Sequence, residues 1–73
     1  MRLHPLKPAE VIRILEHLGF QRIRQKGSHI YFRHSDGRST VVPFHKGEDI
    51  GRGLLRTILR EIEIPWEEFI RAK

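Results

Sequence analysis

The sequence of 73 residues contains no cysteine. This excludes disulfides, zinc sites built on cysteine and a cysteine nucleophile, and it favours a reducing, cytoplasmic location. The sequence also lacks any stretch near the roughly 20 apolar residues of a membrane span, and its first residues lack the apolar run of a signal peptide. We therefore expect no targeting segment and no membrane partner.

The length and the charge limit the number of domains and the kind of partner that this sequence can have. A chain this short forms one domain at most, so residues 1–73 are expected to be a single domain with a thin core, because it buries only about 60% of its unfolded surface. Its composition, with 38% hydrophobic and 32% charged residues, is that of an ordered domain. The formal net charge of +5 favours a polyanionic partner, although charge alone does not identify one.

The pattern of apolar and turn residues predicts helix, three strands, helix and short helix. Pro8 suits the first turn of a helix over residues 8–18, and Gly19 would end it. The second main helix begins near Gly51 and runs to Ile62, and Pro65 opens a short helix over residues 66–71. The strands are expected over residues 20–25, 29–34 and 39–44, with the first turn at Lys26-Gly27.

The turn between the second and third strands sets their register. A three-residue loop at Ser35-Asp36-Gly37 places glycine in the left-handed position that such hairpins require. The core face then carries Ile30, Phe32, Val42 and Phe44, and the opposite face carries His29, Tyr31, Arg33, Val41, Pro43 and His45. A two-residue turn would pair Ile30 and Phe32 less well, with Val41 and Pro43.

Both main helices must then pack on the single apolar face of the sheet. The expected fold is α+β, a two-layer sandwich of order α-β-β-β-α(-α) with a three-stranded antiparallel sheet. Trp66, Phe69 and Ile70 would seal one end of its core. The other face of the sheet stays open and carries His29.

The five histidines suggest a metal site, but their spacing argues against one. His29 and His34 are five residues apart in one strand, so their side chains point to opposite faces. His4 and His17 lie in an N-terminal segment and a helix, where a solvated or half-packed imidazole is the simpler interpretation. We expect no metal and no cofactor.

The pair His29 and His45 shares one face at one end of the expected hairpin, with Lys26 and Arg24 approaching the same end. An imidazole of near-neutral pKa can take a proton from a 2′-hydroxyl while cations hold the phosphate, so this cluster suits phosphodiester chemistry without a metal. The alternative is a histidine that only caps a strand end by hydrogen bonding.

Two exposed surfaces could bind partners. Arg52, Arg56 and Arg60 form a stripe on the second main helix that could follow a nucleic-acid backbone or simply be solvated. Tyr31, Val41 and Pro43 give the open face of the sheet an apolar surface around His29, as a contact surface would have.

The order of motifs resembles the HicA family of toxins, the YcfA-like mRNA interferases. The motifs are Gly19-Phe20, Gly27-Ser28-His29 with the aromatic strand that follows, Val42-Pro43-Phe44-His45 and Gly53-Leu54-Leu55-Arg56-Thr57-Ile58-Leu59. The resemblance covers about residues 8–62. It departs at Leu54, where many relatives carry threonine, and from Glu63 to Lys73, where it is weak.

The resemblance implies a fold like that of double-stranded RNA-binding domains, cleavage of messenger RNA, growth arrest, and neutralisation by a HicB-type antitoxin that covers the active site. The catalytic histidine of the family maps onto His29, flanked by Gly27 and Ser28. A single histidine cannot supply both proton transfers at once, so His45, Tyr31 or water must supply the second. The residues expected to bind RNA phosphate are Arg24, Lys26, Gly27, Ser28, Arg33 and Lys46.

Two other functions remain open at this point. The same fold and charge would serve a non-catalytic module that binds RNA duplexes by their shape. A pure protein-interaction domain is the third possibility.

Overall fold

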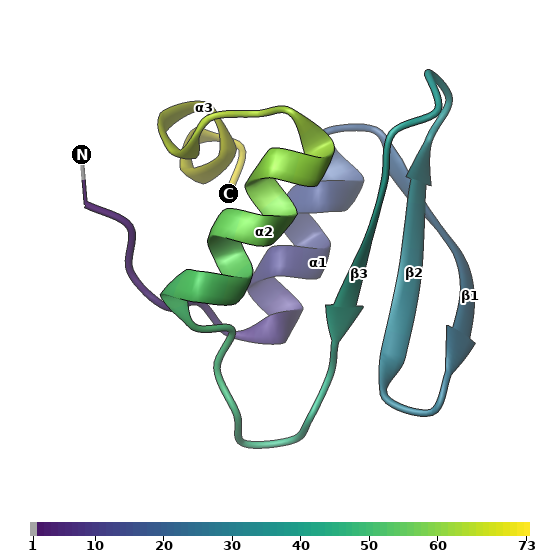
Figure 1. Ribbon diagram of the computed structural model, residues 1–73, viewed down its shortest axis with the longest axis horizontal. Coiled ribbons are helices and arrows are strands. Elements are labelled where there is room, and N and C mark those ends of the chain that lie inside the picture. Colours follow the sequence, from purple (N-terminus) through teal and green to yellow (C-terminus); the bar gives the residue numbers. More distant parts are fainter. Residues whose placement is uncertain (1) are drawn as a thin grey trace.

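The computed structural model describes residues 2–73, and its elements follow the predicted order (Figure 1). Every helix and strand boundary lies within one residue of the predicted one. The elements are α1 (Pro8–His17), β1 (Phe20–Lys26), β2 (His29–His34), β3 (Ser39–Pro43), α2 (Arg52–Ile62) and α3 (Trp66–Arg71).

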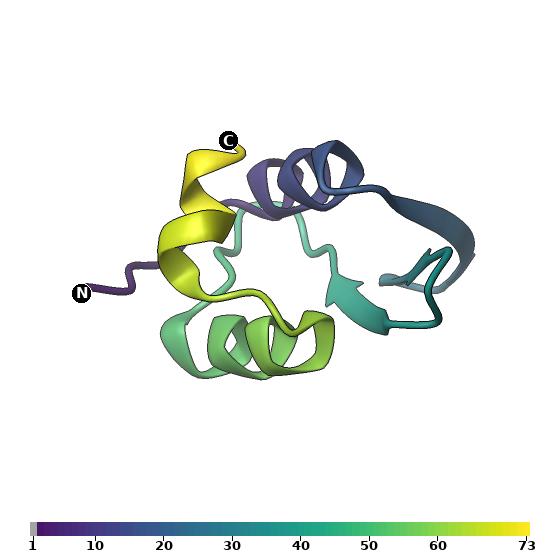
Figure 2. The same ribbon diagram turned by 90° about the horizontal axis from the view of Figure 1, so that it is seen from above.

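The sheet is antiparallel, with strand order β1-β2-β3. The helices form one layer and the sheet the other, as the view from above shows (Figure 2). Helix α1 contacts both β1 and β3, whereas α2 packs mainly along β3. The predicted two-layer α+β fold is confirmed, and one face of the sheet is left open.

The predicted register of β2 and β3 is confirmed. Ile30 pairs with Val42, and Tyr31 pairs with Val41. The three-residue loop is closed by two backbone hydrogen bonds, in which the His34 N–H donates to the Arg38 carbonyl (2.8 Å) and the Gly37 N–H donates to the His34 carbonyl (2.9 Å). Gly37 has a φ of +101°, which explains the glycine there.

The prediction that Phe44 belongs to the core was wrong. Phe44 lies on the helix side of the sheet beside Ile12 and Ile30, but its side chain is 40% exposed. Strand β3 ends at Pro43, so Phe44 lies at the margin of the core, where its ring is only partly covered. Thr40, opposite Phe32, is buried on this face together with Ile30, Phe32 and Val42, at 3% exposure.

A β-bulge at Ile23 changes which side chains of β1 face outward. Arg22 pairs with Phe32, but Arg24 pairs with Tyr31, so Ile23 is an extra residue. One extra residue switches the facing of everything after it. Arg22 and Gln25 therefore lie on the helix side, while Ile23 and Arg24 lie on the open face.

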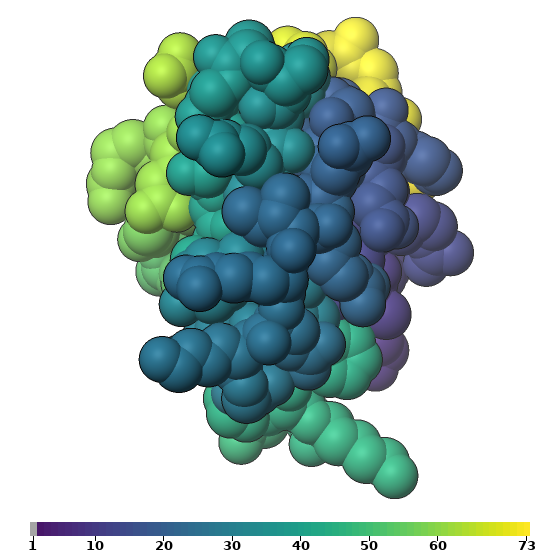
Figure 3. Space-filling model, turned by 90° about the vertical axis from the view of Figure 1, so that its right-hand side faces the viewer, coloured from purple at the N-terminus to yellow at the C-terminus, as the bar shows by residue number. Residues whose placement is uncertain are grey.

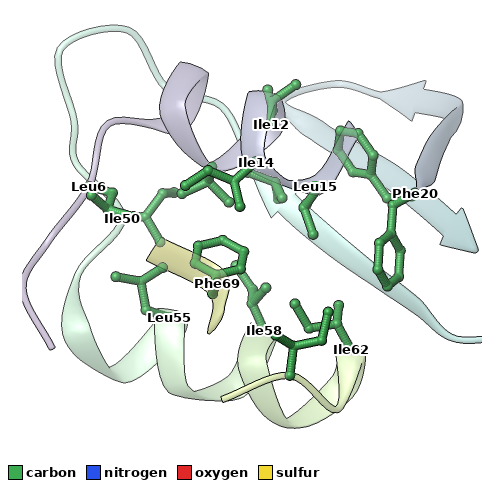
Figure 4. Close-up of a cluster of buried hydrophobic side chains, with 14 of the residues drawn as sticks. Leu6, Ile12, Ile14, Leu15, Phe20, Ile50, Leu55, Ile58, Ile62 and Phe69 are labelled. Carbon is green, nitrogen blue, oxygen red and sulfur yellow. The ribbon is translucent and has the colours of Figure 1, made fainter. Parts of the chain in front are cut away.

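The core lies between the two layers and draws on all the helices (Figure 4). The cluster includes Ile14 and Leu15 of α1, Ile58 of α2 and Phe69 of α3, which are all fully buried, and Phe69 lies near its middle. Trp66 is buried as predicted, whereas Ile70 is only half-buried. Within residues 2–73, no helix is long and apolar enough to cross a membrane.

An isolated bridge ties the N-terminal segment to the connection before α2. The Leu6 N–H donates to the Ile50 carbonyl (3.1 Å) and the Ile50 N–H donates to the Leu6 carbonyl (2.7 Å). Both side chains are 3% exposed and extend the core. The bridge anchors the end of the loop that joins β3 to α2.

Candidate functional site

The candidate site lies where the β1–β2 turn and the chain leaving β3 meet, at one end of the sheet (Figure 1). Lys26 pairs with His29, so the turn consists of Gly27 and Ser28 alone, rather than beginning at Lys26 as predicted. Gly27 has a φ of +58°, as the first position of a type II′ turn requires. Nothing lies within 4 Å of where its Cβ would stand, so a ligand can approach the turn closely.

Ser28 joins this turn to the chain that leaves β3. Its carbonyl accepts a hydrogen bond from the Phe44 N–H (2.7 Å), and its hydroxyl lies 3.3 Å from Nε2 of His45. His45 was predicted to lie beside His29 on the open face; it contacts Ser28 of the same turn, and it also lines a hollow with Lys7, Pro8 and Ala9 of the helix layer. In Figure 3 the loop after β3 projects at the bottom of the face that β1 crosses.

His29 is exposed on the open face, between Lys26 of β1 and Pro43 of β3. The other four histidines each make a hydrogen bond within residues 2–73, but the ring of His29 makes none there. The alternative of a histidine that only makes a hydrogen bond at a strand end fits His45, which contacts the Ser28 hydroxyl, rather than His29. The His29 imidazole is thus the one whose nitrogens are both available to a ligand.

His34, by contrast, is held on the helix side of the sheet. Its ring packs edge-on against Phe20, with 5.0 Å between ring centroids, and its Nδ1 accepts a hydrogen bond from the Asp36 N–H (3.2 Å). The predicted opposite facing of His29 and His34 is confirmed. Across residues 2–73, no three histidine, aspartate or glutamate side chains gather as a metal site would need.

Three basic residues, Arg24, Lys26 and Arg33, lie on the open face of the sheet with His29, and Lys46 lies in the loop that follows β3. Arg24, Lys26, Arg33 and Lys46 are all exposed, and none of them pairs with a carboxylate within residues 2–73. The bulge at Ile23 is what brings Arg24 and Lys26 to this face. The bulge was not predicted from the sequence, although Arg24 and Lys26 were both named there as phosphate-binding candidates.

Tyr31 is half-buried and stands two residues beyond His29 on the same face. Residues two apart in a strand are about 7 Å apart. The Arg24 guanidinium lies over the Tyr31 ring, 4.4 Å from its centroid. Tyr31 is therefore a neighbour of His29, and the Arg24 guanidinium already covers one face of the Tyr31 ring.

The other end of the sheet holds a separate charged cluster with a structural role. Hydrogen bonds from Arg38 lower the pKa of the Asp36 carboxyl, and the same contact raises the pKa of Arg38. Arg38 also covers the Phe20 ring and donates to the carbonyl of Ile62 at the end of α2. This cluster joins the β2–β3 hairpin to α2 and lies away from His29.

The comparison with curated proteins returns no match. The comparison with protein families matches residues 8–64 to the family described as HicA toxin of bacterial toxin-antitoxin. The match covers all three strands, α1 and α2, and it includes the turn, His29 and His45. The chain therefore belongs to the HicA toxin family and is a toxin of a bacterial toxin–antitoxin system, which implies an antitoxin partner.

Proposed function

We propose that this toxin is an endoribonuclease that cleaves messenger RNA in the cytoplasm, with His29 as its catalytic base or acid. The observation that carries the proposal is the state of His29. It is exposed, its ring is free of hydrogen bonds within residues 2–73, and it stands beside Lys26 at a turn that a ligand can approach closely. Such a histidine can exchange a proton with a substrate without first breaking an internal bond.

The chemistry that fits these residues is transfer of the phosphodiester to the neighbouring 2′-oxygen. A base removes the 2′-hydroxyl proton, the oxygen attacks phosphorus, and the 5′-oxygen leaves with a proton from an acid, giving a 2′,3′-cyclic phosphate and a 5′-hydroxyl. Lys26 and Lys46 would hold the phosphate and its developing charge, since fixed cations stabilise such transition states. Arg24, Arg33, Gly27 and Ser28 would contribute to RNA binding.

The second proton transfer belongs to His45, Tyr31 or water. His45 has its Nε2 engaged with Ser28, and Tyr31 lies under the Arg24 guanidinium, so each reaches a substrate only by giving up or sharing a contact. The pH dependence of cleavage separates these groups. Loss of one limb of a bell-shaped profile in His45→Ala or in Tyr31→Phe would identify the partner.

A HicB-type antitoxin would neutralise the toxin by covering the open face. Val41 and Pro43 are half-buried there, and Ile23 is 53% exposed, which makes an apolar surface around the basic residues. A partner that buries apolar area at this place would exclude RNA from His29.

The test is cleavage of a messenger RNA by the wild type, His29→Ala and His4→Ala. His4 is also exposed, and it packs on Trp66 away from the sheet, so its variant controls for loss of a surface imidazole. We expect His29→Ala to lose roughly 10²- to 10⁴-fold in rate, the usual range for a general acid or base, and His4→Ala to keep full activity. Equal rates in wild type and His29→Ala would rule out the catalytic assignment.

The second candidate is an RNA-binding module without catalysis, favoured by the aromatic and basic open face. It predicts RNA binding that weakens with salt, no cleavage products, and little sensitivity to His29 compared with the arginines and lysines.

A further inference from the structure

A hollow of about 310 Å³ lies on the open face of the sheet, beyond Tyr31 as seen from His29. Its floor is the pair Phe32 and Thr40, whose side chains point into the core and which therefore line it mainly with backbone. The cross-strand pairs Tyr31–Val41 and Arg33–Ser39 bound its two ends. Ile23 and Arg24 line it from β1, and Glu61 of α2 lines it from the far side of β3.

The walls of the hollow suit a flat aromatic ligand. The Arg24 guanidinium already lies on the Tyr31 ring at 4.4 Å, so both planar groups are available to a third ring that stacks on either of them. Ile23 and Val41 add apolar surface beside them. Aromatic rings and arginine planes are the surfaces on which proteins stack unpaired bases.

The polar residues of the hollow distinguish between bases. One Glu61 oxygen accepts a hydrogen bond from the Thr40 hydroxyl (2.8 Å), which fixes the carboxylate at the edge of β3. A carboxylate only accepts hydrogen bonds, so it favours a base edge with an exocyclic amine and repels the two carbonyl oxygens of uracil. Adenine, cytosine and guanine carry such an amine.

We propose that this hollow binds a single unpaired RNA base, stacked on Arg24 and Tyr31, and that Glu61 selects a base with an exocyclic amine. The proposal rests on the proposed function in taking RNA as the ligand, and it adds the recognition of a base next to the cleaved bond. The distance of about 7 Å between residues two apart in a strand separates the base site from His29. Recognition and proton transfer thus use different residues of one strand.

The test is direct binding of RNA that cannot be cleaved. Octamers of adenylate, cytidylate or uridylate with 2′-O-methyl groups lack the nucleophile, so binding is measured by fluorescence anisotropy independently of catalysis. We expect the adenylate and cytidylate octamers to bind at least several-fold more tightly than the uridylate octamer. Glu61→Gln keeps an oxygen that can accept from Thr40 and adds an amide donor, so it should remove or reverse that preference.

Matched variants separate stacking from charge. Arg24→Ala and Arg52→Ala each remove one exposed arginine, but Arg52 lies on α2 and does not line the hollow. We expect Arg24→Ala and Tyr31→Ala to weaken binding of the adenylate octamer roughly tenfold, Tyr31→Phe to retain affinity, and Arg52→Ala to cost much less. Because these octamers cannot be cleaved, failure of the catalytic assignment leaves this test intact.

Two results would overturn the proposal. If Arg24→Ala and Arg52→Ala weaken RNA binding equally, Arg24 contributes only its positive charge and does not stack on a base. Equal affinity of the three octamers in both wild type and Glu61→Gln would exclude base selection, and would leave the hollow as part of the surface that the antitoxin covers.

Discussion

Gly19 and Gly37 offer a matched pair for testing the packing at the end of the sheet opposite His29. Both have left-handed backbones, with φ of +94° and +101°. A Cβ on Gly37 would meet nothing within 4 Å, whereas a Cβ on Gly19 would stand 3.0 Å from Nε2 and 3.2 Å from Cδ2 of His34. Alanine at the two positions therefore imposes a similar backbone strain but a different steric cost.

The magnitudes follow from those two terms. A Cβ on a left-handed residue costs about 1–2 kcal/mol in the folded state. Alanine also makes the unfolded chain less flexible than glycine does, which returns about 0.4–1 kcal/mol, so Gly37→Ala should lower the free energy of unfolding by roughly 1 kcal/mol. Gly19→Ala should lose about 1–3 kcal/mol more, the usual cost of overpacking, because His34 is held between Phe20 and Asp36. The total free energy of unfolding of a domain of this size is roughly 4–11 kcal/mol.

The assay is urea unfolding followed by circular dichroism, with the double variant Gly19→Ala, His34→Ala as the rescue. Shortening His34 removes the atoms that the new methyl group meets, so the double variant should lose less than the sum of the two single changes. Equal stability of Gly19→Ala and Gly37→Ala would refute the steric argument. So would strict additivity of the two changes in the double variant.

Two further predictions concern stability. The pKa of Asp36 is lowered in the folded state, chiefly by its hydrogen bonds with Arg38, so its stabilising effect is present above the ordinary aspartate pKa of about 3.9 and is lost as the pH falls through the lowered value. The Tm of the wild type should therefore exceed that of Asp36→Asn at neutral pH, and the two should converge in acid. A Tm difference that stays constant with pH would contradict the linkage. Phe32→Ala should lower the free energy of unfolding in urea by about 3–5 kcal/mol, because the ring is fully buried. Phe44→Ala should lower it by about 1 kcal/mol or less, because that ring is 40% exposed, and equal losses in the two variants would contradict the placement of Phe44.

The sequence was sufficient to predict the elements, their order and the pairing of β2 with β3. The reason is local. Helical spacing marks α1 and α2, and the Asp36-Gly37 turn permits one three-residue loop that keeps Ile30 and Val42 on one face. The facing of His29 and His34 followed from the same register.

The remaining features depend on contacts that the local pattern does not contain. The bridge between Leu6 and Ile50 joins segments far apart in the chain. Thr40 is polar by type, and only its hydrogen bond with Glu61 of α2 accounts for its burial. Phe44 looked like core because alternation continued past Pro43, where the strand itself ends.

The bulge at Ile23 connects the fold to the site most directly. In an unbroken strand, alternation from the buried Phe20 would send Arg24 and Lys26 toward the helices and Gln25 toward solvent. No alternation in β1 specifies a register, because its residues after Phe20 are polar on both faces except for Ile23. The extra residue instead places Arg24 against Tyr31 and Lys26 opposite His29, while Phe20 keeps its place under α1. One inserted residue thus lets a single strand serve the core at its start and supply cations to the open face at its end, which neither alternation nor composition could indicate.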